Sequence, residues 1–172
     1  MVSQLKVNEI IKQSGSTLTI GQDGDTVSGP FTNVPAFIAH KTSGQSLSSG
    51  THTKITFDSE EIDTNNGYST STSTYTVPVA GYYNLFYSYR FDSGADFDNT
   101  LVYMKYNGST NIMSKYGVNR YYDGHYMAFI KQLSVGDTLE VYGYQSTGSS
   151  YNFGGGNDNG YVSVFGAMRL IG

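Results

Sequence analysis

The chain has 172 residues, a length that fits one domain with a small appendage. It contains no cysteine, which excludes a disulfide framework, a thiolate zinc site and a cysteine nucleophile. Its formal net charge is −4 and no two Lys or Arg residues are adjacent, so the chain lacks the clustered positive charge with which proteins bind nucleic acid.

The first thirty-four residues contain short stretches typical of strands, separated by turns. Residues 5–11 and 16–20 are rich in β-branched side chains, whereas residues 21–25 are rich in Gly and Asp, which favour turns. This segment has too little apolar material to fold alone. We therefore expect residues 1–34 to form an extended or β N-terminal anchor or trimerisation segment, followed by a head domain of residues 35–172.

From residue 36 onward, short apolar stretches recur between turn signals such as Asn107-Gly108 and Gly136-Asp137, the second of which predicts a tight hairpin. The chain has 16 Tyr, 9 Phe and 21 Gly but only 14% charged residues. That composition is typical of half-buried strands joined by tight turns. We expect strands at residues 36–40, 53–57, 73–77, 82–91, 101–106, 126–133, 138–144 and 161–170.

The stretch 82–91 has the clearest strand pattern in the chain. Its alternate residues are apolar and would share one face, which indicates an antiparallel strand buried on one side. Several such strands without a long amphipathic helix predict an all-β fold, an antiparallel two-sheet jelly-roll sandwich. The apolar residues of that face are Tyr83, Leu85, Tyr87, Tyr89 and Phe91.

Motifs from residue 55 onward occur in an order found in a known family. They are Ile55-Thr56-Phe57, Gly67-Tyr68, Tyr75-Thr76-Val77-Pro78, Gly81-Tyr82-Tyr83, residues 133–139 and residues 164–170. This order resembles the globular head of complement component 1q, a branch of the tumour-necrosis-factor-like jelly rolls, over about residues 36–171. The chain departs from the family pattern where Val77 precedes the Pro and where Phe165-Gly166 lacks a spacer. The resemblance implies a homotrimer, with an aromatic and aliphatic patch of each jelly roll meeting at a threefold axis.

The first thirty residues resemble a different group of proteins. Residues 6–10, 18–21 and 24–27 are similar to N-terminal and stalk segments of bacteriophage fibre and virion structural proteins. This resemblance implies that residues 1–34 hold three chains together or bind other virion proteins. Collagen-like Gly-X-Y repeats are absent, which argues against a role in animal immunity.

The residues that could carry catalysis do not form a recognisable motif. His40, His52 and His125 are far apart in the sequence and lack the spacing of metal ligands. No phosphate loop or Ser-His-Asp arrangement can be argued from spacing either. We therefore expect a non-enzymatic protein without a catalytic site or a cofactor.

One loop carries several carboxylates and is a weak candidate calcium site. Asp92, Asp96 and Asp98 are close in the sequence, and carboxylate oxygens are ligands that Ca²⁺ prefers. The alternative is a solvated turn rich in Asp and Gly, and this alternative is the stronger of the two.

Two clusters rich in Tyr and Asn are candidates for ligand binding. Tyr and Asn on loops offer contact area and adaptable hydrogen bonds, which suit a glycan or a protein. The alternative is that these Tyr residues line a trimer seam or cap the core. The candidate ligand-binding residues are Tyr151, Asn152, Phe153, Asn157, Tyr121 and Tyr122.

Three functions fit these features. The first is a homotrimeric phage virion surface protein, a tail-fibre-type or receptor-binding component that attaches to a host-surface glycan or protein. The second is a capsid decoration or cement protein of the phage head. The third and weakest is a secreted cellular binding domain, disfavoured because the first residues lack the apolar part of a secretory signal. No stretch approaches about 18 apolar residues, so we expect no membrane span. The resemblance of the first thirty residues implies a location on the phage particle surface.

Overall fold

The structure is a computed structural model that describes residues 34–91, 97–119, 124–154 and 163–171. Within these ranges, it gives the backbone alone at residues 97–99, 113, 115–119 and 124–125. Residues 34–172 belong to one compact unit. The predicted anchor of residues 1–34 lies outside the described residues except for Val34, and the division at residue 34 stays a prediction.

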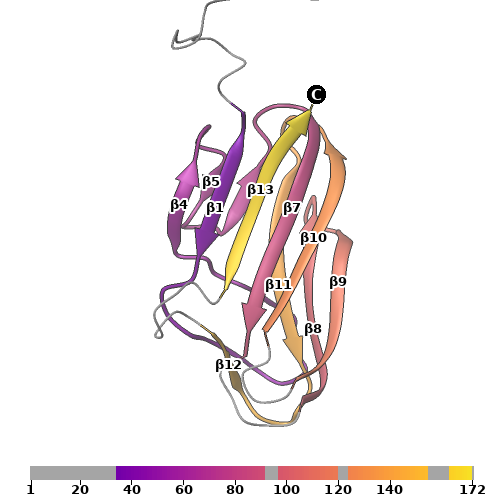
Figure 1. Cartoon of the computed structure of the whole chain (residues 1–172). Helices are drawn as coiled ribbons and strands as arrows, with labels where there is room; N and C mark the ends of the chain where they lie inside the picture. Colours follow the sequence, from indigo (N-terminus) through magenta and orange to yellow (C-terminus); the bar gives the residue numbers. More distant parts are fainter. Residues whose placement is uncertain (1–33, 92–96, 120–123, 155–162, 172) are drawn as a thin grey trace, which may run out of the picture. The chain divides into compact units, whose positions relative to one another are not determined.

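The first large sheet has five strands, and all neighbours in it are antiparallel. Figure 1 looks onto this sheet, with the C-terminus at its upper end. In spatial order the strands are β10 (Gly124–Leu133), β7 (Gly81–Arg90), β13 (Val164–Ile171), β1 (Ala36–His40) and β4 (Ser59–Asp63).

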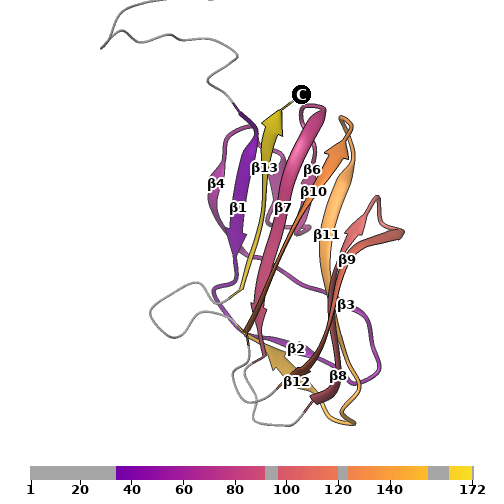
Figure 2. The ribbon, with the colours of Figure 1, turned by 45° about the vertical axis from the view of Figure 1, so that its right-hand side comes forward.

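The second large sheet forms the other layer of the sandwich, as the turned view shows (Figure 2). In order it contains β5 (Tyr68–Ser69), β6 (Thr74–Thr76), β11 (Thr138–Gln145), β8 (Phe97–Tyr106) and β9 (Thr110–Asn119). The short β3 (Thr53–Lys54) also pairs with β11. A separate two-stranded sheet consists of β12 (Tyr151–Phe153) and β2 (Gln45–Leu47).

Aromatic side chains fill the core between the two large sheets. The Phe37 ring stacks on Tyr75 with centroids 4.1 Å apart and meets Phe165 edge-on at 4.8 Å. The buried face predicted for residues 82–91 is confirmed, because each of its five residues has 1% or less of its surface exposed: Tyr83, Leu85, Tyr87, Tyr89 and Phe91. Burial of such large rings is the main favourable term in folding this domain.

The two turns singled out in the sequence have different roles. Asn107 and Gly108 have φ angles of 50° and 67°, and they close a β8–β9 hairpin of the kind in which both central residues need positive φ. The hairpin expected at Gly136-Asp137 is wrong, because β10 pairs in the first sheet and β11 in the second. This turn instead carries the chain from one layer to the other.

The predicted all-β jelly roll is confirmed, with strands at each expected position, and the described residues contain no helix. Consequently no described segment is a helix long and apolar enough to cross a membrane. The short strands β2, β5 and β12 and the longer strands β4 and β9 were not expected from the sequence.

Candidate assembly surface

The outward face of the five-stranded sheet is unusually apolar for a surface in contact with water. Along β7, alternate residues point into the core, so Tyr82 and Phe86 point outward. Residues paired directly across antiparallel strands share a face, which places the partners of these residues on the outward face as well. The exposed hydrophobic residues of this face, here called the assembly face, are Ile62, Tyr82, Tyr126, Ile130, Met168 and Ile171.

At the centre of the assembly face, the Phe86 ring packs against Gly166. Phe86 is paired with Gly166 in β13, and a Cβ added at Gly166 would lie 2.3 Å from Phe86 Cζ. The ring therefore occupies the place where a side chain of residue 166 would stand. Phe86 also lies beside Tyr126, with ring centroids 6.4 Å apart. The missing side chain at Gly166 thus lets an aromatic ring approach the β13 backbone closely.

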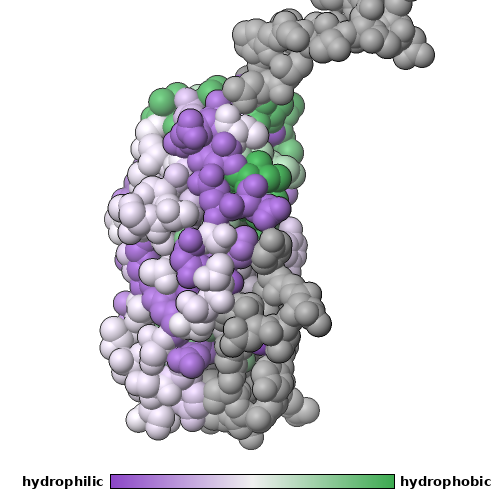
Figure 3. All heavy atoms as spheres, turned by 90° about the vertical axis from the view of Figure 1, so that its left-hand side faces the viewer, coloured by the Kyte–Doolittle hydropathy of each residue, from purple (hydrophilic) through white to green (hydrophobic). Residues whose placement is uncertain are grey.

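The end of the domain at which β13 finishes is also apolar. Val79, Val135 and Leu170 are exposed there, next to the apolar end of the assembly face. Figure 3 shows hydrophobic atoms gathered at the upper end of the domain, whereas most of the side in view is hydrophilic or neutral. On the side in view, the apolar surface is therefore confined mainly to this end of the domain.

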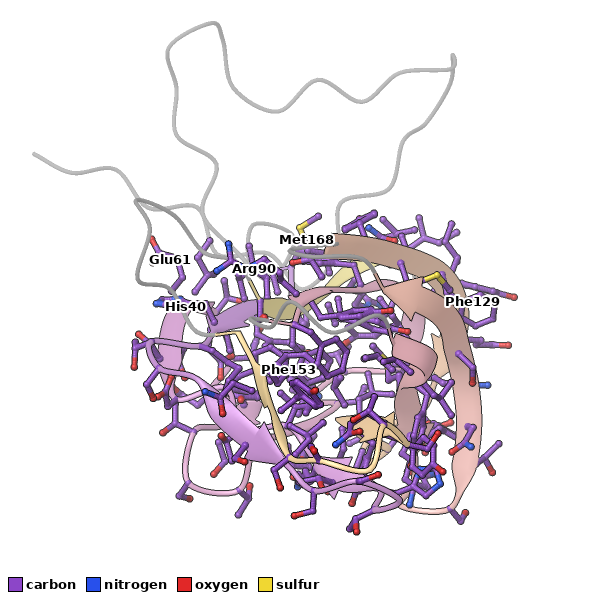
Figure 4. All side chains as sticks on the ribbon, turned by 90° about the horizontal axis from the view of Figure 1, so that it is seen from below. His40, Glu61, Arg90, Phe129, Phe153 and Met168 are labelled. Atoms are coloured by element: carbon purple, nitrogen blue, oxygen red, sulfur yellow. The ribbon has the colours of Figure 1, made fainter. Side chains whose placement is uncertain are left out.

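The lower part of the assembly face carries polar and charged groups. Arg90 lies at the end of β7, Glu61 lies in β4, and His40 at the end of β1 is only 7% exposed. Figure 4 shows Glu61, Arg90 and Met168 on the same side of the sheet. An apolar half and a charged half on one face would allow a partner to bind in only one register.

Strand β10 forms one edge of this sheet and is apolar on both of its sides. Tyr126 and Ile130 point to the assembly face, whereas Phe129 is in register with core residue Leu85 yet is 43% exposed. Figure 4 shows Phe129 at the side of the sandwich, well away from Met168. Residues 126–130 include no charged residue, although charges normally protect edge strands from pairing with other chains. The assembly face and this apolar edge thus meet along one strand.

The loop cluster predicted to bind a ligand is only partly described. Asn152 is exposed and Tyr151 is half-buried in the short strand β12. Phe153 has no exposed surface and packs against Tyr89 and Phe91, with centroids 5.9 and 5.5 Å away. The prediction that Phe153 contacts a ligand is therefore wrong, because its ring belongs to the core, where Figure 4 also places it.

The other predicted site residues lie outside the described part of the chain. Asn157, Tyr121 and Tyr122 belong to segments that the structure does not describe, and so do Asp92 and Asp96 of the candidate calcium loop. The backbone at Asp98 belongs to β8. Among the described residues no group of three or more His, Asp or Glu residues could hold a metal ion. These sites stay predictions.

The assembly face was not identified from the sequence, although a signal for it was present. Residues 126–130 are apolar at consecutive positions, and strict alternation would have made every second one polar. A strand that is apolar on both sides is stable when other residues shield both sides from water. The core of the sandwich shields one side of β10, and a second molecule would have to shield the other.

The comparisons with known proteins bear on the fold. No protein-family model matches the chain, and no curated protein does. The globular domain of zebrafish complement 1qA matches with a TM-score of 0.55 and 16% identity, over 79% of this chain and 97% of that chain. Eiger TNF from S. frugiperda matches with a TM-score of 0.58 and 13% identity, over 80% and 93%. Murine APRIL at pH 5.0 matches with a TM-score of 0.62 and 13% identity, over 80% and 99%. At such identities the likeness shows the fold, and it confirms the predicted jelly roll of complement 1q and TNF proteins.

Proposed function

We propose that the chain is a non-enzymatic, homotrimeric component of a bacteriophage virion surface, in which residues 1–34 anchor the protein and the jelly roll projects as a fibre-type or receptor-binding head. The single observation that carries the trimer is the apolar assembly face together with the uncharged edge of β10 beside it. The virion setting is supported by the resemblance of residues 6–27 to phage fibre and virion segments.

The position of the two apolar surfaces favours a ring of copies over a twofold dimer. A twofold dimer would bury one assembly face against another and would leave Phe129 and the β10 edge in water. If the edge of one copy packs on the face of the next, the contacts are head to tail. Such contacts form a ring when the rotation between copies closes, and both surfaces are then covered in every copy. The resemblance to complement 1q and TNF-like heads supports three copies in that ring.

Light scattering on the full chain tests the oligomer directly. We expect a mass of three times 18.8 kDa at micromolar concentration. A monomer under these conditions would remove the basis of the proposal, since the assembly face would then stay in contact with water.

Two charge variants separate the ring from the dimer. Met168→Glu places a charge on the assembly face and leaves the β10 edge unchanged, whereas Phe129→Glu places a charge on the β10 edge and leaves the assembly face unchanged. In a ring each variant alone is monomeric, and a mixture of the two gives a one-to-one pair through the one intact contact. If Phe129→Glu alone still forms a dimer, the contact is between two faces. Ser149→Glu, an exposed position outside both surfaces, is the matched control.

The location and copy number in purified phage particles test the virion role. A few tens of copies per particle at the tail or as short fibres fit the proposed role, and adsorption should then be blocked by the isolated protein. Hundreds of copies on the capsid would instead favour the decoration or cement function. Absence from particles would overturn both and would favour a secreted binding domain.

A further inference from the structure

The outward face of the second sheet carries a row of aromatic rings. Tyr103 in β8 is paired with Tyr142 in β11, and the two rings stack with centroids 5.6 Å apart and an interplanar angle of 19°. Neighbouring Val141 faces the core, so this pair faces outward. His52, just before β3, stacks on Tyr144 at 4.5 Å and meets Tyr103 edge-on at 5.6 Å. We call His52, Tyr103, Tyr142 and Tyr144 the aromatic row.

Hydrogen bonds hold the aromatic row in one arrangement. The Tyr103 hydroxyl and His52 Nδ1 are 3.1 Å apart, and the Tyr142 hydroxyl donates to Glu140 Oε2 at 3.4 Å. Lys54 Nζ in turn forms an ion pair with Glu140 Oε1 at 2.6 Å. Rings fixed in this way lose little conformational freedom when a ligand binds. His52 is exposed and Tyr142 and Tyr144 are half-buried, so solvent reaches the row at these three residues, whereas Tyr103 is only 2% exposed and supports its neighbours from within the row.

The charge beside the row is positive. Lys54 and Glu140 neutralise each other, whereas Lys105 Nζ lies over the Tyr142 ring at 4.3 Å. In the described part of the chain, no carboxylate lies within ion-pair distance of Lys105 Nζ. A half-buried ammonium group at one end of a row of rings therefore offers a place for an anionic group of a ligand.

We propose that the aromatic row with Lys105 binds an acidic oligosaccharide, a short run of pyranose rings that carries a uronate carboxylate. The C–H faces of sugar rings pack on aromatic side chains, and their hydroxyls exchange hydrogen bonds with groups such as Lys54 and Glu140. Tyr144 is paired with Leu101 of β8, which precedes Lys105 by four residues. Four residues of a strand span roughly 13 Å, which is longer than one pyranose ring. The ligand is therefore an oligosaccharide and not a single sugar.

This inference deepens the receptor-binding role and rests on it for the source of the saccharide, a host-surface polysaccharide. It places recognition on the second sheet and not on the loops around Asn152 that the sequence suggested. The competing interpretation is that the rings serve only to cover the outer side of the sheet, and the experiment below decides between the two.

Saturation-transfer NMR on the full chain tests the proposal with a panel of uronate trisaccharides, beginning with trigalacturonate and its neutral methyl ester. We expect the acid to bind about tenfold more tightly than the ester, because a hydrogen bond to a charged group is lost in the ester. His52→Ala should weaken both ligands, and Lys105→Gln should weaken the acid alone and abolish its preference. Asn152→Ala, on the originally predicted loop, is the matched control and should change nothing.

Each outcome of this experiment either supports or overturns the inference. Loss of binding in Asn152→Ala with binding kept in His52→Ala would move the site to the loop. Absence of saturation transfer from the trimeric wild-type protein to every member of the panel would leave the rings with a covering role only. Sugar binding by a protein that is monomeric or absent from particles would uphold the aromatic row while rejecting the proposed function.

Discussion

Replacement of Gly166 by Ala perturbs the assembly face at its centre. The added Cβ would lie 2.3 Å from Phe86 Cζ and 2.9 Å from the Phe37 carbonyl oxygen. Since carbon atoms pack best at about 3.5–4.0 Å, the Phe86 ring must move by roughly 1 Å or more. The ring lies on an open face and can turn away, but the Phe37 carbonyl belongs to the β1 backbone beside β13 and cannot move without straining the ladder.

The free energy of unfolding should therefore fall by about 1–3 kcal/mol, the usual range for overpacking. Phe86→Ala alone removes a half-buried ring and should cost about 1–2 kcal/mol, less than the loss of a fully buried Phe. In the double variant the added methyl no longer meets the ring. The two effects should then fall short of additivity by about 0.5–3 kcal/mol.

Denaturant unfolding of the four proteins at one fixed protomer concentration measures this coupling, since unfolding of an oligomer depends on concentration. Gly44→Ala is the matched control, because its Cβ would meet Asn152 at an ordinary 3.7 Å, and it should change stability by less than about 0.5 kcal/mol. Additive effects of Gly166→Ala and Phe86→Ala would refute the reasoning, since the ring would then not occupy the place of the missing side chain.

Two further predictions concern polar groups of the domain. Asp137→Ala should lower the free energy of unfolding by about 2 kcal/mol, because the Asp137 carboxylate accepts hydrogen bonds from Ser134 N at 2.8 Å and from Tyr106 Oη and Asn107 Nδ2 at 2.9 Å each. Burial alone would raise the pKa of Asp137, but these hydrogen bonds outweigh it and lower the pKa below its usual value. Tyr75→Phe should leave thermal stability unchanged or raise it by about 1 kcal/mol, because no hydrogen bond of good geometry reaches the buried Tyr75 hydroxyl among the described residues. The neighbouring Tyr83 hydroxyl donates to the Val79 carbonyl oxygen instead.

Because the pKa of Asp137 is lowered in the folded state, the stabilisation by its carboxylate depends on pH, and this dependence tests the prediction. A carboxyl whose pKa is lowered in the folded state stabilises that state above its unfolded pKa, and the contribution is lost as the pH falls through the folded pKa. The stability difference between wild type and Asp137→Ala should therefore be full above about pH 5 and shrink below it. A difference that stays constant down to pH 2 would contradict the proposed hydrogen bonds. For Tyr75→Phe, a loss of more than 1 kcal/mol would mean that the hydroxyl has a partner.

The sequence was sufficient for the long strands and for the fold, because alternation along β7 is a local pattern that burial on one side imposes. Strand β9 was missed because Thr110–Asn119 contains Gly, Ser and Asn and is held in place by its hairpin partner β8. Strand β4 was missed because Glu60 and Glu61 are typical of a surface turn. Charged residues of this kind are also what protects an edge strand, which is the position β4 occupies.

The candidate surfaces were harder to predict than the fold because they depend on pairing between distant residues. Met168 and Ile130 share the assembly face only through their common neighbour Asn84, to which both are paired. Tyr103 and Tyr142 likewise form a stack only because β8 and β11 are neighbours. Phe153 was misjudged for the same reason, since its short strand β12 lies beside β2 and buries the ring. Residues that are close in the sequence can be recognised as one loop from the sequence alone. The residues of these surfaces are brought together only by the register of the strands.

The two large sheets thus present different surfaces to solvent: an apolar assembly face on the first sheet and the aromatic row with Lys105 on the second. A trimer would use the first surface for assembly and the second for binding. If copies cover the apolar assembly face for one another, the aromatic row on the second sheet is left to solvent, because it faces the other way across the sandwich. Three identical rows on one particle component would bind a repetitive polysaccharide together, so that weak contacts at each row add to strong attachment overall. Assembly and recognition would then depend on separate sheets. A change that dissolves the trimer, such as Met168→Glu, should therefore weaken attachment to the polymer while it leaves the affinity of each row for a trisaccharide unaltered.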